Sequence, residues 1–423
     1  MRGCGALLAL ALVTGTAGMA QAHEDAAPEL PVIQSIDFAG NDITQPKVML
    51  REMVVKPGDP ADPARVERSR QGIQDLGLFK SVAVRETPVP GGVALTFVVE
   101  ERWYILPIPR LDANSEGESA YGMTLRWFNF AGLNHTIRGN YTRRDEEKAN
   151  KGESISYGVG YSMPFVADTP WGIGMSVGHS ETPITDFGGY TESVDSAGIS
   201  LTRSFASGPA SQGWNAGVSL TWSDQRTEGL GAPEAQGTAA LLGLWGGYRD
   251  VRYAIYSEEG IVWSAGVAGA NEGLLSDYSI GSARIGVTRY LRIGERAHQS
   301  VHAFAAAATQ HGGPTGYRSV GGAYGLGGAS LLRAYPADFV TGDFYYLVGA
   351  EYLRPIVWDW LRGVIVLEAG NAWAEASSSD SRVYASLGFG LRVRATFLVN
   401  FEVEAGVAIP LDEGGQRFFA SKV

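Results

Sequence analysis

Hydrophobic and polar residues alternate along several segments of the chain after Trp103. Residues 153–165 place Ile, Tyr, Val, Tyr, Met and Phe on one face and Ser and Gly on the other. Residues 214–223 and 399–407 repeat this pattern, and Glu402 and Glu404 lie on the polar face of the second segment. A period of two residues predicts β-strands with one face in an apolar medium and the other in water.

Strands of a soluble β-sandwich and of a transmembrane β-barrel both alternate between apolar and polar residues. The size of the residues on the polar face distinguishes the two architectures. Gly, Ser, Thr, Asn and Glu form these faces, and the chain has 56 Gly, 18 Tyr and 10 Trp. This composition, with few helix signals, favours a transmembrane β-barrel over a soluble β-sandwich. Because every backbone polar group must be paired in lipid, such a sheet must close. Residues 103–423 have room for about 16 antiparallel strands, each of about 9–11 residues with its connection.

Residues 31–102 differ from the rest of the chain in their hydrophobic pattern and predict a small α+β domain. The expected order is strand, helix, helix, strand, strand, with a turn at Pro57-Gly58. We expect Thr44 to cap the first helix and Asp62 to cap the second. The strands are expected at residues 33–38, 82–85 and 93–99.

The first 22 residues predict a secretory signal peptide. Arg2 supplies the positive start, residues 6–13 form a short apolar run, and Ala20-Gln21-Ala22 has the small-x-small cleavage pattern. Cys4 is the only cysteine and lies in this segment, so no disulfide framework and no thiolate metal site is expected after it. The net charge of −11 argues against nucleic acid as a partner. We also expect no helical membrane span, because no later stretch has 18 unbroken apolar residues.

Two local motifs suggest chemistry but have simpler interpretations. Gly174-Met175-Ser176-Val177-Gly178 matches the G-x-S-x-G pattern of serine hydrolases, yet it lies within an alternating strand rather than at a strand-to-helix turn. His298 and His302 have a helical metal-ligand spacing, but on a strand they would lie about 13 Å apart. We therefore expect solvated histidines, no catalytic residues, no metal and no cofactor. No glycine-rich phosphate loop opens a helix either.

Arg333 lies in a long glycine-rich stretch, Gly327-Gly328-Ala329-Ser330-Leu331-Leu332-Arg333-Ala334-Tyr335, and Glu368 lies on a later strand-like run. An arginine can hold a carboxylate through its planar fork, so the two residues would fix the loop if both faced a barrel lumen. The spacing alone is equally compatible with two separate charges in water.

These segments together resemble the POTRA-plus-barrel outer-membrane proteins, the group of BamA, TamA and the two-partner secretion exporters, also called bacterial surface antigen proteins. The stretches Ile36 to Asn41, Leu76 to Phe79 and Phe97 to Glu101 resemble the start, middle and end of a single POTRA module. Leu332-Arg333-Ala334-Tyr335 resembles the family's Val-Arg-Gly-Phe/Tyr loop motif, with Ala334 in place of glycine. Glu368-Ala369-Gly370 resembles its Asp-x-Gly motif, with Glu368 in place of aspartate.

The resemblance implies a fold, a location and a function. Residues 31–102 would form a periplasmic POTRA domain and residues 103–423 an outer-membrane barrel. The function implied is insertion of outer-membrane proteins or translocation of polypeptides, with extended client polypeptides, outer-membrane lipid and periplasmic accessory proteins as partners. A dedicated exporter of one secreted protein and a passive porin-like barrel remain alternatives.

The resemblance also implies site residues. Arg333, Tyr335, Glu368 and Gly370 would anchor the loop in the lumen. A client strand would be added to the POTRA sheet at the strand that carries Val93, Leu95 and Phe97. Residues 416–423 would form the weak half of a seam between the first and last strands.

Overall fold

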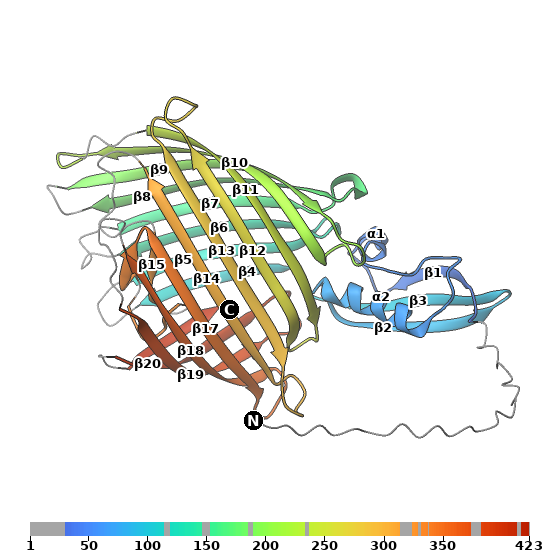
Figure 1. Cartoon of the computed structure of the whole chain (residues 1–423). Coiled ribbons are helices and arrows are strands. Elements are labelled where there is room, and N and C mark those ends of the chain that lie inside the picture. The colour runs from blue at the N-terminus through green and yellow to red at the C-terminus, as the bar shows by residue number, and fades with distance from the viewer. Residues whose placement is uncertain are drawn as a thin grey trace, which may run out of the picture.

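The computed structural model describes residues 30–113, 119–145, 153–184, 189–232, 237–313, 324–328, 331–336, 338–373, 382–412 and 416–422. A small N-terminal module lies at one end of a large sheet that curls into a barrel (Figure 1). The expected signal peptide, residues 1–22, falls outside the described residues.

The N-terminal module has the expected order of elements: β1 (Ile33–Ala39), α1 (Pro46–Leu50), α2 (Pro63–Asp75), β2 (Phe79–Val89) and β3 (Gly92–Glu101). Its three strands form one sheet in the order β1-β3-β2, with β1 parallel and β2 antiparallel to β3. Fully buried apolar side chains from both helices and from the sheet form its core; they include Ile33, Met49, Ile73, Leu95 and Phe97.

Asp62 caps α2 as expected, because its carboxylate accepts a hydrogen bond from the amide of Ala64 at 2.9 Å. The expectation for Thr44 is wrong. The N-cap of α1 is Gln45, and Thr44 is buried, where its hydroxyl bonds to the carboxylate of Glu101. Thr44 therefore holds the start of α1 against the end of β3 rather than capping the helix.

The expectation that Val93, Leu95 and Phe97 lie on a free sheet edge is also wrong. They belong to β3, which is the central strand and is paired on both sides. All three side chains are buried in the core of the module. The edge strands are β1 and β2. The backbone of Ile33 at the start of β1 is already bonded to Gly58 and Asp59.

The barrel is one 16-stranded antiparallel sheet with strands in sequence order. Its strands are β4 (Ile105–Ala113), β5 (Ser119–Phe130), β6 (His135–Asp145), β7 (Glu153–Met163), β8 (Trp171–Ile184), β9 (Tyr190–Ser204), β10 (Gly213–Glu228), β11 (Gly237–Tyr253), β12 (Glu258–Ala270), β13 (Ile280–Arg292), β14 (Ser300–Gly312), β17 (Phe344–Pro355), β18 (Leu361–Trp373), β19 (Tyr384–Arg394), β20 (Glu402–Pro410) and β21 (Arg417–Lys422). A two-stranded hairpin, β15 (Tyr324–Leu326) and β16 (Val340–Gly342), lies between β14 and β17, and a short 3-10 turn, η2 (Val166–Asp168), joins β7 to β8. The expected fold class and strand number are confirmed.

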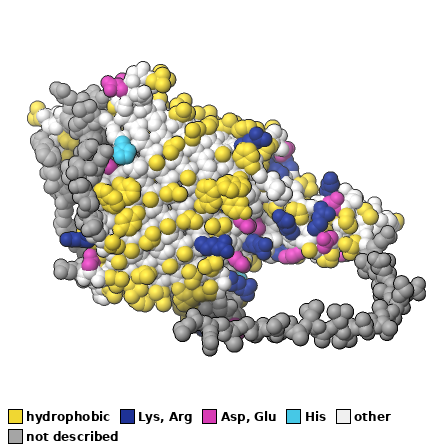
Figure 2. Space-filling model, viewed as in Figure 1, with side chains coloured by type: hydrophobic (Ala, Val, Ile, Leu, Met, Phe, Trp, Pro, Cys, Tyr) yellow, Lys and Arg dark blue, Asp and Glu magenta, His cyan; other side chains and the backbone are white. Residues whose placement is uncertain are grey.

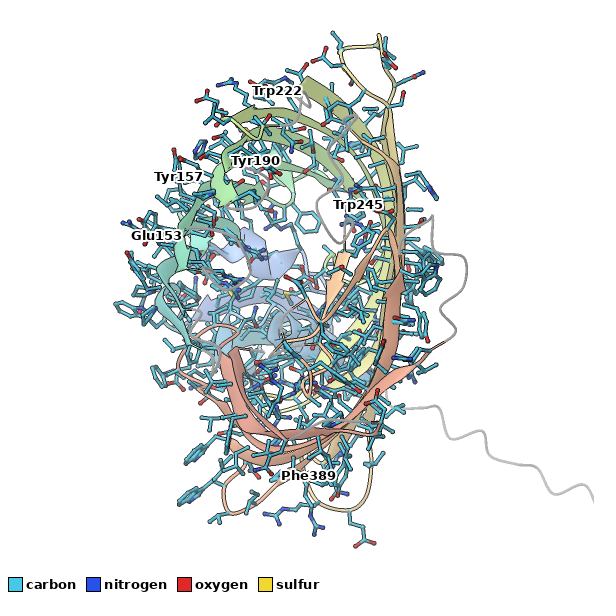
Figure 3. The ribbon with its side chains drawn as sticks, turned by 90° about the vertical axis from the view of Figure 1, so that its left-hand side faces the viewer. Glu153, Tyr157, Tyr190, Trp222, Trp245 and Phe389 are labelled. Atoms are coloured by element: carbon cyan, nitrogen blue, oxygen red, sulfur yellow. The ribbon has the colours of Figure 1, made fainter. Side chains whose placement is uncertain are left out.

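The outer wall of the barrel is apolar, as a lipid-facing surface requires. Ile199, Leu244 and Ile285 are more than half exposed on this wall. Apolar side chains cover the wall in Figure 2, whereas charged ones gather on the N-terminal module and at the adjoining barrel end. Phe389 and Trp222 lie outside the wall and Trp245 lies inside it (Figure 3). The only helices seen in the described part of the chain are too short or too polar to cross a bilayer.

The two ends of the sheet form a seam. Among the described residues, β4 pairs only with β5 and β21 pairs only with β20. Below the seam, next to the N-terminal module, the backbone of Trp103 bonds to those of Phe397 and Val399. The sheet is therefore fixed at its base, while the first and last strands have no ladder between them.

Candidate functional site

The loop between β14 and β17 returns into the barrel and carries Arg333 to the inner wall. Gly327 has φ +127°, and a Cβ there would overlap the carbonyl oxygen of Pro336, so the fold requires glycine at this position. A tight turn follows, in which the amide of Tyr335 donates to the carbonyl of Leu332 at 2.9 Å. Leu332 is fully buried and supplies the left-handed residue of this turn, with φ 48°.

Arg333 contacts three carboxylates of the barrel wall. Its Nη1 donates to Glu368 at 2.6 Å, its Nη2 donates to Glu351 at 2.7 Å, and its Nε lies 3.3 Å from Glu404. The backbone amide of Arg333 also donates to Glu368 at 3.0 Å. Glu368 has no exposed surface. The structure thus brings together the pair that the sequence suggested and adds two carboxylates that the sequence did not suggest.

The other two expected loop residues lie beside this arginine. The hydroxyl of Tyr335 donates to the carbonyl of Ala385 at 3.1 Å and bonds to the carboxylate of Asp412. Gly370 faces the loop hairpin, and a Cβ there would press on the carbonyl of Tyr346 and on Leu326. Together with the contacts of Arg333, they fix the loop to four strands, β17, β18, β19 and β20.

The last strand also contacts the loop arginine. Phe419 in β21 points into the barrel, and its ring centre lies 5.6 Å from the guanidinium carbon of Arg333. The same ring belongs to a buried apolar cluster with Leu332 and Tyr335. The loop anchor and one side of the seam are therefore in direct contact.

The ion pairs continue from Arg333 down the inner wall. Arg392 donates to Glu351 at 2.7 Å and also bonds to Glu404. Arg362 donates to Glu402 at 2.6 Å. All five side chains are buried. Buried carboxylates and guanidinium groups are stable only when they are paired in this way.

The lower part of the network reaches the end of the barrel that faces the N-terminal module. Arg394 bonds to both Glu402 and Glu258. His302 is buried between Glu258 at 3.9 Å and Glu351 at 3.8 Å, so the expectation of a solvated His302 is wrong. The guanidinium of Arg394 also lies 5.2 Å from the ring centre of Tyr253.

Tyr253 links the network to the N-terminal module. Arg102, directly after β3, lies 5.3 Å from the same ring and donates to the Tyr253 hydroxyl at 3.2 Å. A continuous set of contacts therefore runs from the loop, through the wall, to the linker between module and barrel.

Most of this network was not predicted from the sequence, although the spacing of four of its residues indicates it. Arg392 and Arg394 stand two residues apart before a turn, and Glu402 and Glu404 stand two residues apart after it. In an antiparallel hairpin this spacing places Arg392 opposite Glu404 and Arg394 opposite Glu402, which is the register observed.

Carboxylates of the N-terminal module hold the turns of the barrel. Glu52 is buried and accepts hydrogen bonds from the amide and hydroxyl of Ser211, at 3.0 and 2.9 Å. Asp75 accepts a hydrogen bond from the amide of Tyr253 at 2.7 Å. The amide of Gln45 donates to Gly132 at 2.9 Å. The module is thus docked on the turns β9–β10, β11–β12 and β5–β6.

This docking surface predicts a pH dependence. Burial raises the pKa of Glu52 to about 7, against the opposing effects of the Ser211 hydrogen bonds and of Arg51 nearby. Burial also raises the pKa of Asp75 to about 6, although Arg249 and Arg252 act in the opposite direction. An acid with a raised pKa in the docked state favours docking most below its ordinary pKa, near 4.5 for Glu52, and this contribution is lost as the pH rises through about 7.

We therefore expect docking to weaken between pH 5 and pH 8 by at most about 3 kcal/mol for Glu52. Glu52→Gln should remove most of this pH dependence and tighten docking at pH 8. Hydrogen exchange of the turn at residues 205–212, measured at both pH values, checks this expectation. Glu67→Gln is the matched control, because Glu67 is exposed and its one ion pair among the described residues is with Arg70 of its own helix. Equal pH dependence in the wild type and Glu52→Gln would contradict the assignment.

The G-x-S-x-G segment lies within a strand, as its alternating pattern predicts. Ser176 lies in the middle of β8, paired with Gly160 and Gly198, so no strand-to-helix elbow surrounds it. Within the part of the chain that is described, no group of three or more His, Cys, Asp and Glu side chains is arranged to hold a metal ion.

A three-stranded α+β module followed by a 16-stranded barrel, with a loop arginine bound to a lumen carboxylate, has the POTRA-plus-barrel architecture. Residues 31–102 match the family model of the POTRA domain, described as a surface antigen variable number repeat. The outer membrane protein assembly factor BamA of Neorickettsia risticii (strain Illinois) is 31% identical over 135 residues, which are 31% of this chain and 17% of that protein. The match thus spans less than a fifth of the length of that relative.

Solved structures show the same fold at low sequence identity. CdiB from Escherichia coli has a TM-score of 0.60 and 12% identity, covering 93% of this chain and 76% of CdiB. BamA from Haemophilus ducreyi, lacking POTRA domains 1–3, has a TM-score of 0.53 and 14% identity, covering 94% of this chain and 86% of that chain.

Proposed function

We propose that this protein resides in the outer membrane, with its POTRA module in the periplasm, and that it inserts outer-membrane proteins or translocates polypeptides. The observation that carries this proposal is the coupling of the loop anchor to the seam, because Arg333 contacts both Glu368 on the inner wall and Phe419 in the last strand. A movement of the loop would therefore shift β21, which forms one edge where a client strand would pair.

The first and last strands are suited to accept a client strand. Unpaired strand edges present rows of free amide and carbonyl groups, which an extended chain can occupy. No ladder joins the described residues of β4 and β21, so opening this seam would break few hydrogen bonds. The contact between Arg333 and Phe419 would then control how far β21 moves.

We now propose β2 rather than β3 as the client edge of the POTRA module, because β3 is paired on both sides. Among the described residues no strand pairs with the outer edge of β2, and Arg85, Glu86 and Thr87 are exposed along this strand. A photo-crosslinking side chain at Arg85 should trap extended clients by β-augmentation. The same group at Asp37 of β1 is the control and should trap few. Equal crosslinking at both positions would overturn the choice of edge.

Quantitative proteomics of the outer membrane after depletion tests the function. Loss of many barrel proteins supports general assembly, and loss of one secreted protein supports a dedicated exporter. Normal composition with altered solute uptake would leave only the passive barrel and would overturn the proposal.

A further inference from the structure

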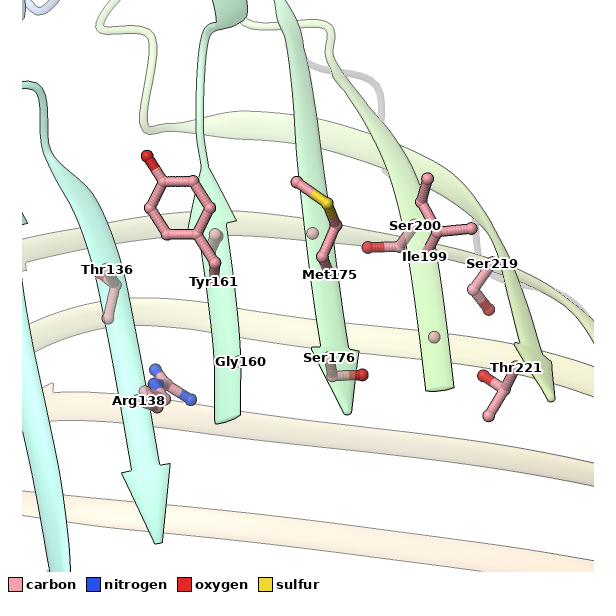
Figure 4. A pocket seen from close by; sticks show the side chains of 13 residues that line it. Thr136, Arg138, Gly160, Tyr161, Met175, Ser176, Ile199, Ser200, Ser219 and Thr221 are labelled. Carbon is pink, nitrogen blue, oxygen red and sulfur yellow. The ribbon is translucent and has the colours of Figure 1, made fainter. Parts of the chain in front are cut away.

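The inner wall formed by β6 to β10 is lined by glycines and hydroxyl groups rather than by the ion pairs of the opposite wall. An open hollow of about 330 Å³ lies against this wall. Figure 4 shows side chains that line it. The polar side chains at this hollow are Thr136, Arg138, Ser162, Ser176, Ser200, Ser219 and Thr221.

Two arginines stand side by side at the edge of this hollow. Arg126 in β5 lies directly opposite Arg138 in β6, and both face the lumen. Cross-strand neighbours lie about 5 Å apart at Cβ, and like charges at this position destabilise a sheet. Neither arginine forms an ion pair within the described part of the chain, and Arg138 is exposed. Their proximity raises the local positive potential on this wall.

The lumen glutamates of the described strands do not offset this charge. Glu258, Glu351, Glu368, Glu402 and Glu404 are all engaged by the arginines of the opposite wall. Glu192 faces the lumen from β9, but it accepts a hydrogen bond from Gln225 at 3.1 Å and lies about 20 Å along the strand from Gly198. The wall that carries Arg126 and Arg138 is therefore cationic, although the whole chain has a net charge of −11.

The register places open space beside the arginines. Arg138 lies opposite Gly160, Gly160 opposite Ser176, Ser176 opposite Gly198, and Gly198 opposite Thr221. Figure 4 shows Arg138, Ser176 and Thr221 in one row across the strands. Because Gly160 has no side chain, open space lies beside Arg138. The Ser176 hydroxyl leans the other way, over Gly198, where an added Cβ would lie 2.9 Å from its oxygen.

We propose that this row is an oxyanion-binding site in the lumen. A carboxylate or phosphate group would lie over Gly160, held by the planar fork of Arg138, with Arg126 supplying a second positive charge. The oxyanion comes either from a free anion or from an acidic side chain of an extended polypeptide in the lumen. The site goes beyond the assembly or translocation function proposed above and does not depend on it.

A reporter thiol measures the potential of this wall directly, even when the barrel conducts no ions. Cys4, the only cysteine, lies in the expected signal peptide, so Ser162→Cys provides a single reporter that lines the hollow. In the purified full chain, the thiol is modified by a sulfonate-bearing and a trimethylammonium-bearing methanethiosulfonate. We expect the anion-to-cation rate ratio to fall roughly five- to tenfold in Arg126→Gln/Arg138→Gln, and the difference to shrink in high salt.

The matched control removes the same charge from the outer wall. Arg252→Gln/Arg289→Gln changes two exposed arginines whose strand positions alternate with lumen-facing Val251 and Tyr290. This variant should leave the rate ratio at residue 162 unchanged. An equal fall in both double variants, or no fall in Arg126→Gln/Arg138→Gln, would overturn the proposal.

Protection of the thiol distinguishes the two sources of the oxyanion. Inorganic phosphate is one probe, and a glutamate-rich peptide compared with its glutamine counterpart is the other. Protection by phosphate alone assigns the site to free anions, and stronger protection by the glutamate peptide assigns it to acidic polypeptide segments. Protection must disappear in Arg126→Gln/Arg138→Gln; failure of both probes to protect the intact wall would overturn the site.

Discussion

Arg333→Ala should destabilise the barrel by about 3–5 kcal/mol, because removing one partner of a buried ion pair leaves the other charge unpaired. Glu368 would lose its guanidinium partner in a site without exposed surface, and Glu351 and Glu404 would keep only the remaining partners of the network. The loop would also lose its contact with Phe419. The midpoint of urea unfolding and protease cleavage within residues 327–336 measure both effects.

Arg284→Ala is the matched control for this experiment. Arg284 also points from a strand into the lumen, opposite Gly266 and Ala308, and forms no ion pair within the described residues. Its loss should change stability by no more than about 0.5 kcal/mol. Similar destabilisation by Arg333→Ala and Arg284→Ala would mean that the loop arginine is no anchor.

A charge swap between Arg333 and Glu368 is a poor test of this pair. The swap would place a glutamate at position 333 close to Glu351 and Glu404, and like charges would then meet in a buried site. We expect the Arg333→Glu/Glu368→Arg barrel to remain less stable than the wild type, even though opposite charges again face each other at positions 333 and 368. Arg333→Lys is more informative, since lysine keeps the charge but cannot bond to Glu368 and Glu351 through a planar fork.

The sequence predicts the barrel well because its signal is repeated in every strand. Side chains alternate between lipid and lumen, and this period survives any error in strand boundaries. The candidate pair of Arg333 and Glu368 depends on recognising two short motifs, because 34 residues of loop and strand separate them and no local rule brings them together. The two further carboxylates on Arg333 require the register of β17 and β20 and could not be predicted without it.

The wrong choice of the POTRA edge has a different cause. Strand order within a sheet is a tertiary property, and the parallel pairing of β1 with β3 places the last strand of the module in the centre. The alternation of Val93, Leu95 and Phe97 predicts a strand with one buried face, and all three side chains are indeed buried. Such a pattern indicates a core-facing strand and carries no information about which strand has a free edge.

The docking of the POTRA module leads to the second large expected effect, that of Gly132→Val. Gly132 lies in the β5–β6 turn with φ +71°, and a Cβ there would overlap the carbonyl oxygen of Ile43 in the module. The backbone amide of Gln45 donates to the carbonyl of the same glycine, so this turn and the start of α1 meet backbone to backbone. Beside this contact, the side-chain amide of Asn129 donates to the Thr44 hydroxyl at 2.8 Å. A β-branched side chain adds both backbone strain, about 1–3 kcal/mol, and overpacking of a similar size.

We expect Gly132→Val to release residues 43–45 from the barrel, to raise hydrogen exchange there and to abolish the proposed function while the barrel still folds. Gly58→Val separates strain from clash, because Gly58 also has positive φ, +92°, but a Cβ there meets no atom within 4 Å. It should lower the stability of the module and leave docking intact. If both variants undock the module equally, backbone strain alone explains the loss, and the contact between Gly132 and Ile43 does not hold the two parts together.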